Sequence, residues 1–90
     1  MHFVWDFRKA AVHRRKHGVS FEEASTALRD PLALTGADPE HSRGEHRWIT
    51  FGLSDFGRLL VVAHTDSGDA IRIISARPAT NSERRMYEEA

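Results

Sequence analysis

In the first part of the sequence, the residues best suited to chemistry are Lys16 and His17, which directly precede Gly18. A glycine at such a place can take the left-handed conformation that ends a helix. A fixed cation and a side chain that exchanges protons near neutral pH therefore lie together at a helix end. This pair suits a site that holds a phosphate and moves a proton. Alternatively, His17 has no chemical role and only interacts favourably with the negative end of the helix dipole.

A second set of candidates lies on the predicted strands of the C-terminal half. Glu45 and Arg47 are two residues apart on one strand, so they point to the same face of a sheet. On the last strand, Arg72 points to the face opposite Ser75 and Arg77 if the strand is regular, and a bulge would change this. Glu45 can act as a general base, and arginines can neutralise the charge that a phosphate gains during transfer. Alternatively, these residues form only a solvated face or cross-strand ion pairs.

Two further groups have simpler explanations. His13 and His17 have the spacing of metal ligands on a helix, but no third ligand accompanies them, so we expect no metal and no other cofactor. Aromatic side chains could stack on bases, yet in so small a domain we expect most of them in the core. These aromatic residues are Trp5, Phe7, Trp48 and Phe51. No P-loop, dinucleotide-binding or nucleophile-elbow motif occurs.

Capping residues and apolar spacing predict the elements that hold these candidates. After a short strand at residues 2–5, Asp6 can cap a first helix that ends at His17. Ser20 and Glu23 predict a capping box at the start of a second helix. The apolar stripe of that helix faces a core.

The remaining chain contains one long loop, three strands and a last helix. Asp30-Pro31 ends the second helix, and residues 32–44 are predicted as the loop. A period of two then predicts strands over residues 45–51, 58–65 and 70–77. Thr80 and Glu83 repeat the capping-box pattern. The predicted order is β-α-α-β-β-β-α, an α+β fold with a small antiparallel sheet and helices packed on one face, in a single domain over residues 1–90.

Composition limits the classes of protein that fit. The absence of cysteine favours an intracellular protein, and no apolar run reaches membrane-spanning length. With zero net charge, the ninety-residue chain as a whole has no strong electrostatic attraction to nucleic acid. The chain begins without signal-peptide architecture. Charge is uneven, with an excess of four positive charges over residues 1–19 and of four negative charges over residues 20–45. Eleven of the thirteen cations are arginine, which binds phosphate through two hydrogen bonds at once.

Several motifs follow one another in a distinctive order along the chain. They are Trp5-Asp6, Lys16-His17-Gly18-Val19-Ser20-Phe21-Glu22-Glu23-Ala24, Asp30-Pro31, Glu45-x-Arg47, Gly57-Arg58, Ile71-Arg72-Ile73-Ile74-Ser75-Ala76-Arg77 and Glu83-Arg84. Over nearly its whole length the sequence resembles the BrnT family of type II toxins. The resemblance implies a fold like that of the RelE toxins. It also implies a metal-independent, cytoplasmic ribonuclease that arrests translation.

The resemblance also implies partners. A BrnA-like antitoxin with a ribbon-helix-helix part is expected to inhibit the protein, and the complex is expected to bind operator DNA only through that antitoxin. No membrane contact is expected. One position departs from the family, because His13 stands where the family commonly has Asn in the first helix. If that Asn shapes the active site, the change bears on efficiency or substrate choice.

Cleavage of RNA by its own 2′-hydroxyl needs a base, cations on the phosphate and an acid for the leaving oxygen. The base is predicted to be Glu45 or His17, and the acid His17 or an arginine. The cations expected on the phosphate are Arg47, Arg72 and Arg77, with Lys16 assisting. Further substrate contacts are expected from Arg58 and Ser75. The competing function is a non-catalytic protein-binding module, or a degenerate toxin that only binds its antitoxin, which the zero net charge slightly favours.

Overall fold

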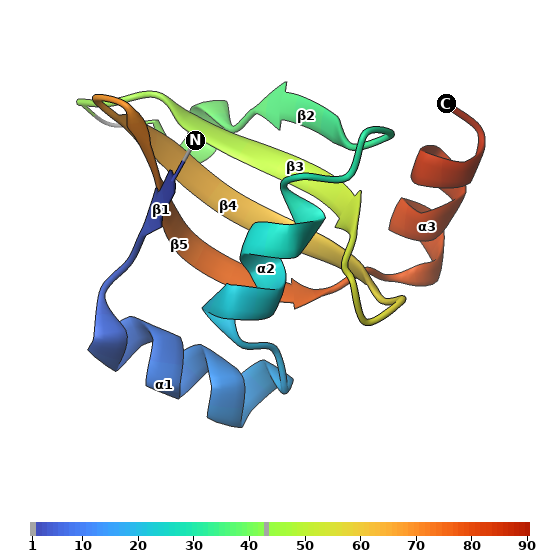
Figure 1. The fold of residues 1–90 in the computed structure, drawn as a ribbon. Helices are drawn as coiled ribbons and strands as arrows, with labels where there is room; N and C mark the ends of the chain where they lie inside the picture. The colour runs from blue at the N-terminus through green and yellow to red at the C-terminus, as the bar shows by residue number, and fades with distance from the viewer. Residues whose placement is uncertain (1, 43) are drawn as a thin grey trace.

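The computed structural model describes residues 2–42 and 44–90 (Figure 1). The strands are β1 (His2–Val4), β2 (Leu34–Ala37), β3 (Arg47–Leu53), β4 (Leu59–Ser67) and β5 (Ala70–Pro78). The helices are α1 (Phe7–His17), α2 (Phe21–Ala27), the short 3₁₀ helix η1 (Pro39–His41) and α3 (Asn81–Glu88). None of these helices has the length and apolar run that crossing a membrane requires. Met1 and Arg43, the latter within the predicted loop, lie outside the described residues.

Three predicted helix boundaries are confirmed by local hydrogen bonds. The Asp6 carboxylate accepts the backbone N–H groups of Arg8 and Lys9, which caps α1. Gly18 ends α1 with a φ of 69°, in the left-handed region that a Cβ disfavours. At α3, Thr80 accepts the Glu83 N–H while the Glu83 carboxylate accepts the Thr80 N–H, so this capping box is complete.

The capping box predicted for α2 is only half formed, and the prediction is wrong in its second half. The Ser20 hydroxyl accepts the Glu23 N–H at 3.0 Å, as expected. The Glu23 side chain, however, turns away from the Ser20 backbone and bonds Ser54 and Arg58 instead. A charged partner that lies far along the chain outcompetes the local backbone donor, because charge-assisted hydrogen bonds are the stronger ones.

The sheet is mixed, not purely antiparallel as predicted. Its strand order is β1-β5-β4-β3-β2, and β1 runs parallel to β5 with His2 opposite Ala70 and Val4 opposite Arg72. The other three pairs are antiparallel. A parallel partner needs a long crossover connection, and α1, α2 and three strands lie between β1 and β5 in the sequence. The predicted antiparallel meander is confirmed for β3, β4 and β5.

The predicted loop over residues 32–44 contains a fifth strand and a 3₁₀ helix, which corrects the element order. β2 pairs with β3, and the Thr35 and Thr50 hydroxyls are 2.7 Å apart across that pair. The Thr50 hydroxyl also lies 2.7 Å from the buried Nε2 atom of His64. Residues 34–37 therefore form a strand because they pair with β3. Their own composition does not predict a strand. β3 itself begins at Arg47, so Glu45 precedes the strand.

One face of the sheet packs against α2, and we call it the α2 face. Buried side chains of α2 and the sheet form the core there: Val19, Phe21, Ala24, Ala27, Leu60, Val62, Ile73 and Ala76. Gly52 lies on this face where α2 ends, and a Cβ on it would come within 2.1 Å of the Ala27 carbonyl oxygen. Only glycine permits this close approach of strand and helix.

The opposite face of the sheet, which we call the distal face, carries the alternate side chains. Ile49 and Phe51 point there, because Thr50 and Gly52 point to the α2 face. Met86 of α3 lines a hollow together with Ile49 and Phe51. The helices therefore do not all pack on one face, which corrects the prediction, and Figure 1 shows α3 separated from α1 and α2 at the far end of β3.

Candidate active site

A β-bulge decides how the last strand presents its polar side chains. His64 pairs with Ile73 but Ala63 pairs with Ser75, so Ile74 is an extra residue in β5. The bulge reverses the alternation between Arg72 and Ser75. As a result Arg72, Ser75 and Arg77 all point to the distal face, the outcome that a regular strand would have prevented.

The same pairing places two arginines on either side of a threonine. Arg47 lies opposite Thr65 on β4, and Thr65 lies opposite Arg72 on β5. Side chains of directly opposed residues share a face and lie about 5 Å apart at Cβ. We call Arg47, Thr65 and Arg72 the arginine row. The threonine was not among the sequence candidates.

Several polar atoms of the arginine row have no partner. The Thr65 side-chain oxygen and the Arg47 Nε atom are buried and make no hydrogen bond to any described residue. Thr65 is only 2% exposed although it lies on the face away from α2. Leaving a buried polar atom unpaired costs about 1–3 kcal/mol, so such atoms require an explanation. Two guanidinium groups around a free hydroxyl group have the chemistry of an anion site.

The segment before β3 fixes the backbone of Arg47. Its N–H group donates to the Ser42 hydroxyl at 3.0 Å, and its carbonyl accepts the Asp38 N–H at 2.8 Å. The Asp38 carboxylate in turn lies 2.8 Å from the His41 Nδ1 atom. These bonds hold the first residue of β3 in register, so the Arg47 side chain starts from a fixed point.

A small hollow lies just before β3 in the chain. It measures about 190 Å³ and is lined by Ser42, Gly44, Glu45 and His46. Both Glu45 and His46 are exposed, and the His46 ring stacks on Trp48 with 5.5 Å between centroids. Trp48 lies opposite His64 and points to the α2 face, so the His46 ring lies toward that face, away from the arginine row. Glu45 is therefore the ionisable candidate in this hollow.

Ser75 and Arg77, two other predicted site residues on β5, differ in whether their side chains have a partner. Ser75 lies on the distal face opposite Ala63, next to the arginine row, and is half-buried. Arg77 lies farther along and binds both carboxylate oxygens of Glu83 at 2.8 Å. The Arg77 guanidinium lowers the pKa of Glu83 to about 2, and this pairing raises the pKa of Arg77. Arg77 thus fastens α3 to the sheet.

Arg58 is engaged even more fully, at the opposite end of β4. Its Nε atom donates to Glu23 at 2.9 Å, and its Nη2 atom donates to the Gly18 carbonyl at 2.9 Å. Glu23 is only 3% exposed and also accepts the Ser54 hydroxyl at 2.8 Å. The hydrogen bond from Arg58 lowers the pKa of Glu23, and the same bond raises the pKa of Arg58. This geometry is that of a structural ion pair.

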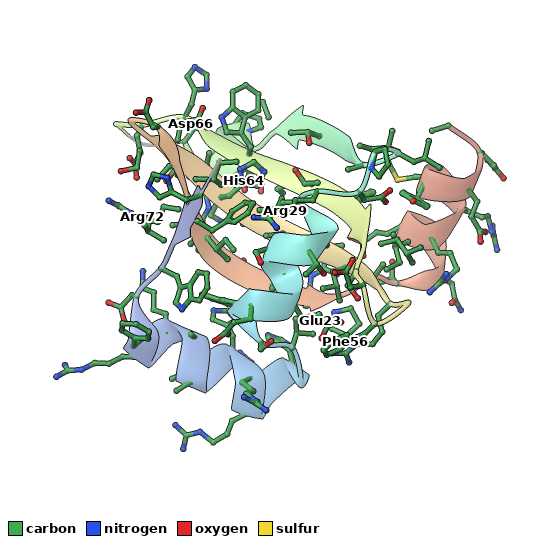
Figure 2. All side chains as sticks on the ribbon, viewed as in Figure 1. Glu23, Arg29, Phe56, His64, Asp66 and Arg72 are labelled. Carbon is green, nitrogen blue, oxygen red and sulfur yellow. The ribbon has the colours of Figure 1, made fainter. Side chains whose placement is uncertain are left out.

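Lys16 and His17 lie near that same end of the sheet, because Arg58 contacts the neighbouring Gly18. An extended strand of the length of β4 separates Arg58 from Thr65 by roughly 20 Å. Figure 2 shows Glu23 and Phe56 at one end of the sheet and Arg72 at the other. The structure therefore places Arg47 and Arg72 in one row, with Glu45 two residues before Arg47, and leaves the Lys16–His17 pair apart from them.

The histidines of α1 contact each other. The His13 and His17 rings stack with 5.6 Å between centroids, and His13 also lies 5.5 Å from the Phe21 ring. Burial lowers the pKa of His13, and the nearby cations of α1 lower it further. Within residues 2–42 and 44–90, no three His, Asp or Glu side chains are grouped as a metal site.

Comparisons with known proteins show the family to which the chain belongs. Residues 5–83 match the protein family described as "Ribonuclease toxin, BrnT, of type II toxin-antitoxin system". The chain belongs to the BrnT family. Membership in this family of ribonuclease toxins implies an RNA target and an antitoxin partner.

A solved BrnT structure has the same fold. The 1.1 Å crystal structure of the Brucella abortus ribonuclease toxin BrnT superposes with a TM-score of 0.65 at 23% sequence identity. The match covers 90% of this chain and 99% of the Brucella chain. At this identity the likeness concerns the fold alone. Among curated protein sequences no match is found.

Proposed function

We propose that this BrnT-family chain is an endoribonuclease that cleaves RNA at the arginine row without a metal. The observation that carries the proposal is the buried, unpaired Thr65 hydroxyl between Arg47 and Arg72. Preorganised donors of this kind stabilise negative charge that develops in a transition state. Two guanidinium groups supply the positive charge that a metal ion supplies in other nucleases.

In the proposed reaction, the ribose 2′-oxygen attacks the adjacent phosphorus and the bond from phosphorus to the 5′-oxygen breaks. Glu45 accepts the proton of the 2′-hydroxyl, because it lines the hollow beside Arg47. Arg47, Arg72 and the Thr65 hydroxyl bind the non-bridging phosphate oxygens. The products are a 2′,3′-cyclic phosphate and a 5′-hydroxyl.

The leaving 5′-oxygen must take up a proton, and we propose that an arginine of the arginine row donates it. The His46 ring is not used, because it stacks on Trp48, which points to the α2 face. His17 was the sequence-based candidate for acid or base, but its place near Gly18 and Arg58 favours neither role. Lys16 lies beside it, and we propose no catalytic part for either residue.

The other candidates take smaller parts in the proposal. Ser75 contacts the RNA next to the cleaved phosphate, since it shares the distal face with Arg72. Arg77 and Arg58 are engaged with Glu83 and Glu23, so we assign them to stability. Only an Arg77 released from Glu83 could reach a phosphate.

The proposal retains the wider expectations of the family resemblance. These are a RelE-like fold, translation arrest and a cytoplasmic location. A BrnA-like antitoxin neutralises the protein, and its ribbon-helix-helix part makes the operator contacts of the complex. An alternative function is a non-catalytic module that only binds its antitoxin.

Controlled expression tests the proposal. Wild type should arrest growth and produce new RNA 5′ ends that carry a hydroxyl. Glu45→Gln and Arg72→Ala should each abolish the new ends, and Arg15→Ala is the matched control because it removes an exposed arginine of α1. Growth, 5′-end mapping and circular dichroism are read together. The non-catalytic module predicts no fragmentation by wild type, and fragmentation by both variants at the wild-type rate would refute the site.

A further inference from the structure

β2 is an edge strand with backbone groups that face outward. Asp38 donates its N–H to the Arg47 carbonyl, so the residue pairs Gly36–Ile49 and Leu34–Phe51 also carry the hydrogen bonds to β3. Thr35 and Ala37 therefore direct their N–H and C=O groups away from β3. The close contact of the Thr35 and Thr50 hydroxyls fits this assignment, since unbonded pairs lie closer. Such an edge is a template for a further strand.

An apolar hollow lies beside that edge on the distal face. It measures about 370 Å³ and is lined by Leu34, Thr35, Gly36, Ala37, Ile49, Phe51 and Met86. Gly36 forms part of its floor, because its missing Cβ leaves open space with no atom within 4 Å. Met86 is 59% exposed at the rim. A strand added to β2 would direct every second side chain into this hollow.

A second hollow continues the first. It measures about 380 Å³, shares Leu34 with the first, and is also lined by Leu32, Tyr87 and Glu88. Leu32 is 73% exposed there. The combined surface, which we call the β2 groove, therefore has apolar walls, outward backbone groups and an acidic side chain at one end. A partner that fits it is an extended peptide with alternating apolar side chains and a basic residue.

We propose that the β2 groove binds an extended segment of the antitoxin, which adds a sixth strand to the sheet next to β2. This inference rests on the proposed function only for the existence of the antitoxin. Peptides added to a sheet edge gain affinity from backbone hydrogen bonds and specificity from side-chain pockets. The groove and the arginine row both lie on the distal face, and Ile49 of the groove is two residues from Arg47 of the row. The two surfaces therefore adjoin each other but share no residue.

Other occupants fit the groove less well. A second copy of this chain would present its own β2, whose only large apolar side chain on the distal face is Leu34, because position 36 is glycine. RNA would place phosphates beside Glu88 and apolar carbons, where neither charge nor hydrogen bonding favours them.

Two substitutions block the groove in different ways. Ala37→Pro removes an outward N–H group and leaves the hydrogen bonds to β3 in place. Met86→Lys puts a charge at the rim of the apolar hollow. The matched control is Val12→Lys on α1, where an apolar side chain is 51% exposed far from β2. The probe is the purified protein encoded by the reading frame beside this gene.

We expect both groove variants to weaken binding of that protein about 30-fold or more, the size of a hot-spot effect, while Val12→Lys changes it little. Hydrogen exchange of the wild-type complex should protect the Thr35 and Ala37 amides. Folding is checked by thermal unfolding. Binding of both variants within about threefold of wild type would overturn the proposal. Dimerisation of the free chain that Ala37→Pro abolishes, or loss of RNA cleavage with antitoxin binding intact, would also overturn it.

The failure of the two proposals can be told apart. If wild type leaves RNA intact but the groove variants still lose the antitoxin, the groove proposal stands and the catalytic one fails. If the groove variants arrest growth and the antitoxin rescues them as it rescues wild type, the groove proposal fails alone.

Discussion

The arginines at the two ends of the central strand β4 differ in their partners. At the start of β4, Arg58 bonds the buried Glu23 and the Gly18 carbonyl. Near the end of β4, Arg47 and Arg72 flank Thr65 without an ion pair to any described residue. In Figure 2, Glu23 lies below α2 and Arg72 lies near β1, toward opposite ends of the sheet.

The difference separates stability from binding. A buried carboxylate with its charged partner stabilises the native state only as a complete pair, and removal of one member leaves an uncompensated charge. Unpaired donors cost stability until a ligand satisfies them. The ion pair at the Arg58 end therefore holds α2 against the turn between β3 and β4. The unpaired donors of the arginine row, at the other end, are free to bind an anion.

The largest effect should come from Arg47→Ala or Arg72→Ala. Each removes one of two guanidinium groups that stabilise the developing charge, so RNA cleavage should fall by about 100-fold or more. The thermal midpoint should stay near that of wild type, since neither side chain has a partner to lose. Single-turnover cleavage of a labelled RNA and thermal unfolding measure the two quantities. A large loss of stability in these variants would erase the contrast between the two ends.

Arg58→Ala should show the reverse. Glu23 would remain buried without its charged partner, but the Arg58 side chain is 41% exposed, so water replaces part of the pairing. We expect a loss of about 2 kcal/mol in the free energy of unfolding. Cleavage by the folded protein should change less than about threefold, because this end holds no substrate. Urea unfolding followed by circular dichroism provides the measurement. Stability equal to wild type would mean that the ion pair contributes nothing.

Thr65→Val sharpens the comparison within the arginine row itself. Valine has nearly the same shape but lacks the unpaired hydroxyl, so the protein should become more stable by about 1 kcal/mol. RNA cleavage should fall by about tenfold, because one donor to the phosphate is lost. Thr50→Val is the control, since its hydroxyl has two partners and its loss should destabilise. A destabilised Thr65→Val would show that its hydroxyl is satisfied after all.

The smallest effect should be a pH dependence from His64 on the α2 face. Burial lowers the pKa of His64, although Asp66 opposes this. The unfolded chain then binds the proton more readily, so stability is complete above the unfolded pKa of about 6.5 and is lost as pH falls below it. Glu83 acts in a lower window, between pH 4.5 and about 2. Urea unfolding at several pH values should show a steeper loss below pH 6.5 for wild type than for His64→Gln; parallel curves would contradict this.

Local features of the fold could be predicted from the sequence. Asp6, Gly18 and Thr80 act on backbone groups within a few residues, so helix boundaries follow from short segments. The meander of β3, β4 and β5 also follows from alternation and short turns. Counting back from the turn at Gly68 and Asp69 would even have placed Thr65 opposite Arg72.

Long-range partners account for what could not be predicted. Glu23 has the right position for a capping box, but its partner Arg58 lies far along the chain. The bulge at Ile74 depends on how β5 pairs with β4, which no local pattern encodes. β2 forms a strand because it pairs with β3, although its Gly36 is a residue type that is uncommon in strands. Candidate residues could therefore be identified by type, and their grouping could not.

The parallel pairing of β1 with β5 determines when the protein is completed. His2 pairs with Ala70, so β1 cannot dock until β5 has left the ribosome. Contacts between residues so far apart in the sequence form late, because closing the long loop between them costs conformational entropy before any contact energy is gained. Val4 lies opposite Arg72, so the late docking of β1 also gives Arg72 its neighbouring strand. During synthesis the edge of the sheet beside Arg72 therefore stays open until β5 has emerged and β1 has paired with it.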